Sequence, residues 1–171
     1  MKNIVLIGPS GIGKTTIGKY ISKKLDIVQI DTDDLIEEKT NMSIKDTFDI
    51  YGEDFFRTIE VQVVKEIADN KNVLISTGGG IVLREENIHA LRSNGIIFFL
   101  NGKIETIVRN LNSSDVDRPL LMNEEDMYEK IKKLFLERKK LYYSSCDYLI
   151  DVDDKSVESI GDEIIFYYDK H

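Results

Sequence analysis

The segment that most constrains the fold of this chain lies near its start, where residues 8–15 read Gly-Pro-Ser-Gly-Ile-Gly-Lys-Thr. This segment satisfies the phosphate-binding pattern G-x-x-x-x-G-K-[ST]. An apolar run at residues 4–7 precedes it and a helical pattern starting near Ile17 follows it, which is the strand-loop-helix context that the pattern requires. The alternative is a glycine-rich turn with an exposed lysine. The context favours a P-loop, and a P-loop implies an α/β fold.

A P-loop binds phosphate through its backbone and two side chains. Glycines let backbone N–H groups turn inward around phosphate oxygens, and the start of the next helix adds its dipole. Lys14 would bring a positive charge to the β- and γ-phosphates of ATP, and the Thr15 hydroxyl would ligate Mg²⁺. The residues predicted to bind ATP here are Gly11, Ile12, Gly13, Lys14, Thr15 and Thr16.

The rest of the chain alternates short apolar runs with helical patterns. The apolar runs lie at residues 4–7, 27–30, 73–75, 96–100 and 148–150. Apolar side chains at helical spacing occur near residues 17–25, 56–67, 131–135 and 157–165. Apolar runs separated by helices predict a parallel sheet covered on both faces. The length of 171 residues predicts one α/β domain spanning residues 1–171.

Charge and cysteine content narrow the class of protein. With 23 Lys and Arg against 31 Asp and Glu, the net charge is −8, whereas a nucleic-acid-binding face needs clustered positive charge. The apolar runs are too short for a signal peptide or a membrane span. Cys146 is the one cysteine of the sequence, and we expect it to be a small buried apolar residue. We therefore expect a cytoplasmic protein with neither a nucleic-acid nor a membrane partner.

Acidic residues follow the second apolar run. A P-loop protein usually holds Mg²⁺ or its waters with an acid at the end of a nearby strand, but the run at 73–75 is followed by Ser-Thr-Gly-Gly-Gly. Asp31, Asp33 and Asp34 instead lie at a predicted strand end, where ligands bind in open α/β sheets. Asp34 and Glu37 form a D-x-x-E capping pattern, so Asp34 is explained as a helix cap. Asp31 and Asp33 are left as the functional candidates.

Two arginines and a glycine triplet also call for an explanation. Residues 78–80 are three glycines, which implies that some group approaches this backbone closely; a tight turn is the alternative. Arg138 follows Leu134 on an apolar helix stripe, where an unpaired guanidinium is costly. Arg57 either pairs with Glu60 on its own helix or, together with Arg138, binds a carboxylate in a cleft.

A polar, turn-rich segment, Asn110 to Pro119, predicts a loop between two helices. An ordinary surface connection is one interpretation of this loop. The other is a mobile lid that brings Arg118 and the preceding Arg109 to phosphate or adenine. A solvated side chain is the alternative for Arg109.

In order along the chain, these motifs resemble the shikimate kinase family. The resemblance is carried by residues 8–16, 31–33, 52–60, 78–80 and 118–121, and by Arg138 followed by Tyr142. It implies a three-layer P-loop kinase fold like that of nucleoside monophosphate kinases, whose five-stranded parallel sheet has the order 2-3-1-4-5 with helices on both faces. It also implies a substrate-binding insertion over about residues 32–60 and a lid over about residues 110–121. We expect the protein to be a monomer.

The resemblance further implies transfer of the γ-phosphoryl group of ATP to the 3-hydroxyl of shikimate, giving shikimate 3-phosphate and ADP. By position, Asp33 would lie beside the attacking hydroxyl, and Arg57 and Arg138 would clamp the carboxylate. Gly79 and Gly80 would offer backbone N–H groups to shikimate.

For the nucleotide, the resemblance places Thr15 and Asp31 at Mg²⁺, Arg118 at the phosphates and Arg109 at adenine. Lys14, Asp33 and Arg118 would be the catalytic residues, and Glu60 would orient Arg57. One alternative function is another small-metabolite kinase of this fold, such as a gluconate kinase. The other is a non-catalytic P-loop module, which leaves Asp33 and Arg138 unexplained.

Overall fold

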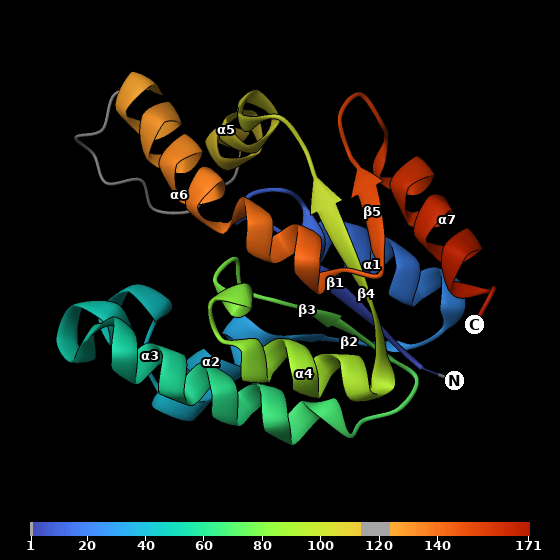
Figure 1. Ribbon diagram of the computed structural model, residues 1–171, viewed down its shortest axis with the longest axis horizontal. Helices are drawn as coiled ribbons and strands as arrows, with labels where there is room; N and C mark the ends of the chain where they lie inside the picture. Colours follow the sequence, from blue (N-terminus) through green and yellow to red (C-terminus); the bar gives the residue numbers. More distant parts are fainter. Residues whose placement is uncertain (1, 114–123) are drawn as a thin grey trace.

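A five-stranded parallel sheet forms the centre of the computed structural model, which describes residues 2–113 and 124–171 (Figure 1). The strands are β1 (Asn3–Ile7), β2 (Val28–Asp31), β3 (Val73–Ser76), β4 (Gly95–Asn101) and β5 (Tyr148–Asp151). Their order is β2-β3-β1-β4-β5, and every neighbouring pair is parallel. The predicted α/β class and strand order are confirmed.

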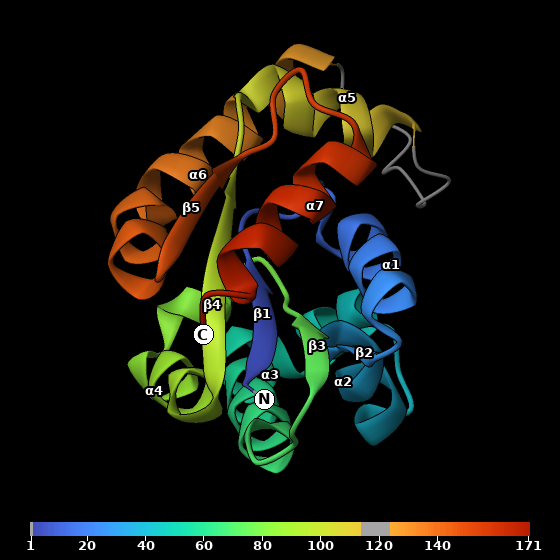
Figure 2. The ribbon, with the colours of Figure 1, turned by 90° about the vertical axis from the view of Figure 1, so that its right-hand side faces the viewer.

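Helices cover both faces of the sheet and make three layers (Figure 2). They are α1 (Lys14–Leu25), α2 (Thr32–Thr40), α3 (Ile44–Ala68), the 3₁₀ turn η1 (Ile81–Leu83), α4 (Glu85–Asn94), α5 (Ile104–Ser113), α6 (Glu124–Ser145) and α7 (Val157–Tyr168). One face packs against α1 and α7, and the other against α3, α4 and the later part of α6. None of these described helices has the length and apolar composition needed to cross a bilayer.

The side chains of the central strand show why the apolar runs could be found in the sequence. Ile4 and Leu6 of β1 face the cluster formed with α1 and α7, whereas Val5 and Ile7 face the cluster on the opposite side. Successive side chains of a strand point to opposite faces, so a strand covered on both sides is apolar at every position. Because parallel strands end at the same edge, this core also brings the loops after β1, β2 and β3 together.

Residues 32–60, the predicted insertion, fold as α2 and the first part of α3. The helix α3 is kinked at Gly52, whose φ of 80° and ψ of 173° are not helical. The residues before the kink pack against α2 in a cluster around Ile36, and within α3 the ring of Phe48 contacts that of Phe56 across the kink. Helix α3 therefore extends beyond the sheet and carries Arg57 just after its kink.

The prediction of a loop beginning at Asn110 is wrong for its first residues, because α5 continues to Ser113. The cause is tertiary: the Asn110 amide donates a hydrogen bond to the Gly11 carbonyl at 2.8 Å, and Leu111 packs against the same glycine. These contacts hold the end of α5 against the P-loop. Arg118 and most of the predicted lid lie outside the described residues.

Candidate active site

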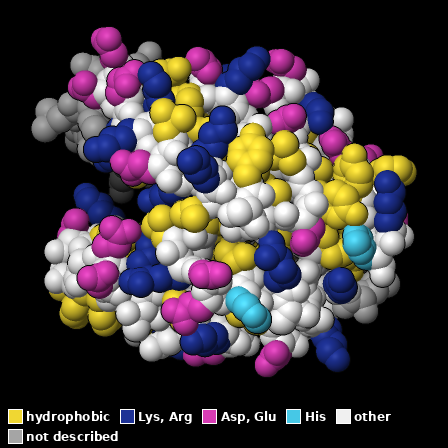
Figure 3. All heavy atoms as spheres, viewed as in Figure 1, with side chains coloured by type: hydrophobic (Ala, Val, Ile, Leu, Met, Phe, Trp, Pro, Cys, Tyr) yellow, Lys and Arg dark blue, Asp and Glu magenta, His cyan; other side chains and the backbone are white. Residues whose placement is uncertain are grey.

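A cavity of about 840 Å³ opens at the carboxyl ends of the central strands. Most of the predicted site residues line it: Gly11, Ile12, Gly13, Lys14, Thr15, Thr16, Asp31, Asp33, Gly79 and Arg109. On the surface, a notch separates the lobe of α5 and α6 from the lobe of α2 and α3, and Lys and Arg side chains lie on both of its edges (Figure 3). This is the edge of the sheet at which open α/β folds bind ligands.

The P-loop connects β1 to α1 and holds a buried lysine. Gly11 and Gly13 have φ values of 83° and 105°, which glycine adopts without steric cost. Lys14 is 7% exposed, and its ammonium donates to the carbonyls of Gly8 at 2.8 Å and Pro9 at 2.9 Å. Burial lowers the pKa of Lys14 to about 8, although the charge of Asp33 raises it. An anion arriving at the loop would therefore meet a cation that lacks a contacting carboxylate among the described residues.

Asp31 connects the P-loop helix to α2. One oxygen of its carboxylate accepts from the Asp33 backbone N–H and the other from the Thr15 hydroxyl, each at 3.0 Å. Asp31 is thus the N-cap of α2, with extended φ and ψ of −106° and 125°. The prediction that Asp34 caps this helix is wrong, because the helix already begins at Thr32.

The contact between Thr15 and Asp31 also bears on a magnesium ion. Hydroxyl and carboxylate oxygens are the hard donors that Mg²⁺ takes, and Mg²⁺ usually keeps several waters and binds through one or two protein groups plus phosphates. The oxygens of Thr15 and Asp31 lie 3.0 Å apart at the edge of the P-loop. No cluster of three or more His, Cys, Asp or Glu side chains suited to a metal occurs in the part of the chain that the structure describes. This pair therefore fits a phosphate-bound Mg²⁺ rather than an all-protein metal cage.

Asp33 occupies the first turn of α2 and faces the glycine triplet. Burial raises the pKa of Asp33 to about 6, and the charge of Asp31 raises it further, while the charge of Lys14 lowers it. At neutral pH the carboxylate is thus mostly ionised but has a much higher proton affinity than an exposed aspartate. Such a group is suited to accepting a hydrogen bond, or a proton, from an alcohol at this edge of the cavity.

Each glycine of the triplet makes room for a different part of the site. A Cβ atom on Gly78 would lie 2.6 Å from a carboxylate oxygen of Asp33, and one on Gly79 would lie 2.8 Å from the Ser10 hydroxyl of the P-loop. A Cβ atom on Gly80 would overlap the Arg57 guanidinium. The close approach inferred from the sequence is thus made by three protein groups, which explains why one or two glycines would not suffice.

Arg57 and Glu60 form a buried ion pair on α3. Arg57 is 6% exposed and Glu60 is 0% exposed, and Nη1 of Arg57 donates to both carboxylate oxygens of Glu60 at 2.9 Å. Burial raises the pKa of Glu60, although the charge of Arg57 opposes this shift. The Asn87 amide donates to Glu60 at 3.4 Å. The intrahelical pair considered from the sequence is therefore formed, and Glu60 fixes the guanidinium beside Gly80.

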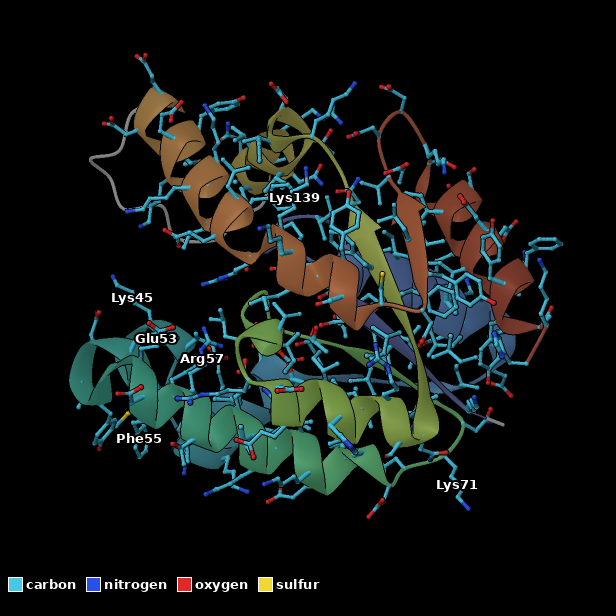
Figure 4. All side chains as sticks on the ribbon, viewed as in Figure 1. Lys45, Glu53, Phe55, Arg57, Lys71 and Lys139 are labelled. Carbon is cyan, nitrogen blue, oxygen red and sulfur yellow. The ribbon has the colours of Figure 1, made fainter. Side chains whose placement is uncertain are left out.

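A second carboxylate lies on the other edge of the same guanidinium. The Glu53 oxygen Oε1 lies 3.4 Å from both Nε and Nη2 of Arg57. The two side chains lie next to each other on the side of α3 that faces α6, as Figure 4 shows. Unlike Glu60, the Glu53 side chain is 59% exposed, so it can move away without leaving a buried charge unpaired.

Helix α6 approaches the glycine triplet from the opposite side. Nη1 of Arg138 donates to the Gly79 carbonyl at 3.3 Å, and the hydroxyl of Tyr142 donates to the same oxygen. The apolar stripe of α6 on which Arg138 was expected to lie is narrower than predicted, because Leu134 is 38% exposed while Phe135 is buried. Arg57 therefore lies beside Gly80, and Arg138 lies beside Gly79.

A further carboxylate that the sequence analysis missed connects the loop after β5 with the start of α5. Asp153, in the loop after β5, accepts from the backbone N–H of Lys103 at 3.1 Å and from the Thr106 hydroxyl at 2.6 Å. It thereby satisfies the start of α5, whose exposed Arg109 lines the cavity together with Val157. Asp153 lies about 50 residues from these partners in the sequence, so no local sequence pattern predicts their contact.

Comparison with known proteins gives one consistent family. The model of the shikimate kinase family matches residues 10–168. The shikimate kinase of Caldanaerobacter subterraneus subsp. tengcongensis is 44% identical over 170 residues, which cover 99% of this chain and 98% of that protein. The shikimate kinase of Thermoanaerobacter pseudethanolicus is 44% identical over 168 residues, which cover 98% of this chain and 96% of that protein.

Solved structures agree with this result. The chain superposes on the shikimate kinase of Acinetobacter baumannii in complex with shikimate with a TM-score of 0.89 at 31% identity, covering 99% of this chain and 94% of that one. For the shikimate kinase of Bacteroides thetaiotaomicron, the TM-score is 0.91 at 29% identity, with 98% of each chain covered. The similarity in sequence and in backbone therefore extends over nearly the whole chain.

Proposed function

The chain belongs to the shikimate kinase family, and from this premise we propose how its residues divide the work of phosphoryl transfer. As an ATP-dependent kinase of the shikimate pathway, it transfers the γ-phosphoryl group of ATP to the 3-hydroxyl of shikimate and releases ADP. In such a reaction the protein itself does little covalent chemistry. Catalysis consists of positioning the two substrates and stabilising the charge on the transferred phosphoryl group.

In this proposal the P-loop end of the cavity binds the phosphates. Backbone N–H groups of residues 11–16 surround the phosphate oxygens, and the Lys14 ammonium leaves its two carbonyl partners to meet the β- and γ-phosphates. Thr15 and Asp31 would hold Mg²⁺ directly or through its waters. When bound, Mg²⁺ neutralises the negative charge that develops on the transferred group. Arg109, on the cavity wall, is the proposed partner of adenine.

The other end of the cavity binds shikimate. Asp33 accepts the hydrogen bond of the 3-hydroxyl, orients its oxygen toward the γ-phosphate and takes its proton as the new bond forms. Arg57, beside Gly80, and Arg138, beside Gly79, donate to the carboxylate. One observation carries the proposal: Lys14, Asp33 and Gly79 line one cavity, so a phosphate on the first can meet an alcohol on the second.

The proposal also covers the organisation of the protein. Residues 1–171 would form a single P-loop kinase domain in which α2 and the first part of α3 serve as the shikimate-binding insertion. We propose a cytoplasmic monomer whose small-molecule partners are shikimate and ATP. The net charge of −8 supports the absence of a nucleic-acid partner.

A coupled assay of ADP release tests the proposed function. Shikimate, gluconate, a nucleoside monophosphate and buffer alone are each offered as the acceptor with ATP and Mg²⁺. Only shikimate should stimulate release strongly. Stimulation by gluconate instead would assign another kinase of this fold, and ATP binding without any acceptor-dependent release would indicate a P-loop binding module. In the same assay, Asp31→Asn should raise the Mg²⁺ concentration needed for half-maximal rate, with Asp34→Asn as the control at the neighbouring exposed position.

A further inference from the structure

Helix α6 directs two donors at one carbonyl oxygen. Arg138 and Tyr142 lie one helical turn apart, and both donate to the oxygen of Gly79. The Arg138 contact is long, at 3.3 Å, and Arg138 is only half-buried. The Tyr142 side chain is 0% exposed and its hydroxyl lies closer to the oxygen. We therefore expect the Arg138 bond to open when a ligand binds and the Tyr142 bond to persist.

The oxygen in question belongs to the peptide that faces the acceptor. The peptide bond between Gly79 and Gly80 is trans, so its C=O and N–H groups point in opposite directions. Holding the carbonyl toward α6 therefore directs the Gly80 N–H away from α6. Among the described residues, no acceptor binds the N–H of Gly79 or of Gly80. These two donors are therefore available to a ligand.

Binding of the acceptor would disturb this arrangement. In the proposed function, Arg138 donates to the carboxylate of shikimate, and a guanidinium that meets a carboxylate in a fork turns its N–H groups to that plane. The Gly79 carbonyl would then lose one of its two partners. A buried carbonyl left without any donor is costly, and two glycines in succession have little steric resistance to a peptide flip.

The ring of Tyr142 does not need the hydroxyl for its own packing. It stacks on Phe99 with centroids 5.0 Å apart and lies 6.4 Å from Phe135. Burial raises the pKa of the hydroxyl, so it remains a donor throughout the neutral range. A phenylalanine at this position would keep the ring contacts and lose the bond to Gly79 together with the hydroxyl's contact with Arg138.

We propose that Tyr142 is a positioning residue for the acceptor: its hydroxyl holds the Gly79 carbonyl while Arg138 binds the shikimate carboxylate, so that the Gly80 N–H group stays directed at shikimate. This inference rests on the proposed function. It adds a residue that acts through the backbone and touches neither substrate.

The test is Tyr142→Phe, with Tyr143→Phe as the matched control. Tyr143 is the next residue, its ring also contacts Phe99, and it is 44% exposed. Loss of one neutral hydrogen bond corresponds to about a three- to tenfold change in affinity. Tyr142→Phe should raise the shikimate KM, and the shikimate Kd from calorimetry, by that factor. The ATP KM and kcat should stay within about twofold, and Tyr143→Phe should match the wild type.

A second acceptor makes the test specific for the mechanism. In an analogue of shikimate whose carboxylate is replaced by a hydroxymethyl group, Arg138 has no anion to bind and keeps its bond to Gly79. The affinity for this analogue should therefore change by less than about twofold in Tyr142→Phe. Equal losses for shikimate and for the analogue would overturn the proposal, as would an unchanged shikimate KM.

The outcomes also separate this inference from the proposed function. If the wild-type protein releases no ADP in response to shikimate, the proposed function fails. If it does respond, and Tyr142→Phe lowers kcat and raises both KM values together with a lower melting temperature, then the hydroxyl is only structural and the positioning role is wrong.

Discussion

Two buried cations at the opposite ends of the cleft, Lys14 and Arg57, have their charges balanced in different ways. Lys14 is bound by two backbone carbonyls, and no described carboxylate forms an ion pair with it. Arg57 is bound by the fully buried Glu60 and, on its other edge, by Glu53. At the phosphate end, the positive charge of Lys14 is therefore left to be neutralised by a ligand. At the acceptor end, the charge of Arg57 is already paired with protein carboxylates.

This difference separates two tasks. A buried charge without a partner destabilises the free protein but binds an arriving anion strongly, as the lowered pKa of Lys14 reflects. A guanidinium that is already paired gains less from an anion, but Glu60 fixes its direction. Substitution of Lys14 should therefore act mainly on the rate, and substitution of Arg57 mainly on the affinity for shikimate.

The largest effect is expected for Lys14→Ala. It removes the cation that stabilises the transferred phosphoryl group, so kcat should fall about a thousandfold. Circular dichroism and the melting temperature would show whether the fold is kept, and Lys19→Ala, at an exposed position of α1, is the control. Substantial turnover by a folded Lys14→Ala protein would contradict the assignment of the P-loop.

Asp33→Asn should reduce kcat on the order of a hundredfold with ATP binding retained, because an amide cannot take the proton of the attacking hydroxyl. In the wild type, kcat/KM for shikimate should fall about tenfold per pH unit below a pH of about 6, where Asp33 is protonated. Asp34→Asn should leave this profile unchanged. A pH profile that keeps the same acidic limb in Asp33→Asn would assign the limb to another group.

The same substitution should stabilise the fold. The pKa of Asp33 is raised from 3.8 to about 6, so the folded state holds a proton across this interval that the unfolded state has lost. The free energy of unfolding therefore falls as pH rises through this window, and the loss persists at neutral pH. Near pH 7, Asp33→Asn should raise the free energy of unfolding by about 1–3 kcal/mol, as measured by urea titration. Near pH 4 the increase should be much smaller. If the variant were less stable than the wild type at both pH values, the ionised Asp33 carboxylate would not destabilise the folded protein.

These two ends also differ in how far the sequence determines them. The P-loop is contiguous, so residues 8–15 and the apolar runs beside them predict both its structure and its place in the sheet. The acceptor end combines α3, the glycine triplet and α6. Residue type and position single out Arg57, Arg138 and the glycine triplet, and the resemblance to a known family assigns their roles, but their contacts could not be read from spacing.

The errors have the same physical origin. The end of α5 depends on the contact of Asn110 with Gly11, which lies 99 residues away. Asp34 and Glu37 form the local pattern of a helix cap, but α2 begins three residues earlier in the capping sequence, because the extended Asp31 accepts from the Asp33 backbone N–H. The role of the Tyr142 hydroxyl depends on a carbonyl 63 residues away. Local patterns predict elements, whereas their exact ends and the supporting hydrogen bonds depend on tertiary packing.

At the acceptor end, Arg57→Lys should raise the shikimate KM about tenfold or more and leave the ATP KM unchanged. Lysine keeps the charge but cannot donate in a fork to a carboxylate while also binding Glu60. Arg84→Lys, at an exposed site, provides the control. A rise in the ATP KM with a constant shikimate KM would show that Arg57 serves the nucleotide instead.

The smallest effect concerns Glu53, whose oxygen lies 3.4 Å from the edge of Arg57 that Glu60 leaves free. A ligand carboxylate bound at that edge must replace Glu53. Because an exposed ion pair contributes at most about 1 kcal/mol, Glu53→Gln should lower the shikimate KM about two- to threefold without changing kcat. Raising the salt concentration should reduce the difference, since exposed charges are screened.

The control is Asp54→Asn, at the next residue, whose exposed carboxylate lies 3.6 Å from Arg84 rather than beside Arg57. It removes the same charge from the same helix, so it measures the general effect of a less negative surface on an anionic substrate. A lower KM in both variants would assign the effect to net charge. A higher KM in Glu53→Gln alone would mean that Glu53 holds Arg57 ready for shikimate instead of competing with it, and the acceptor end would then be fully preorganised by its own carboxylates.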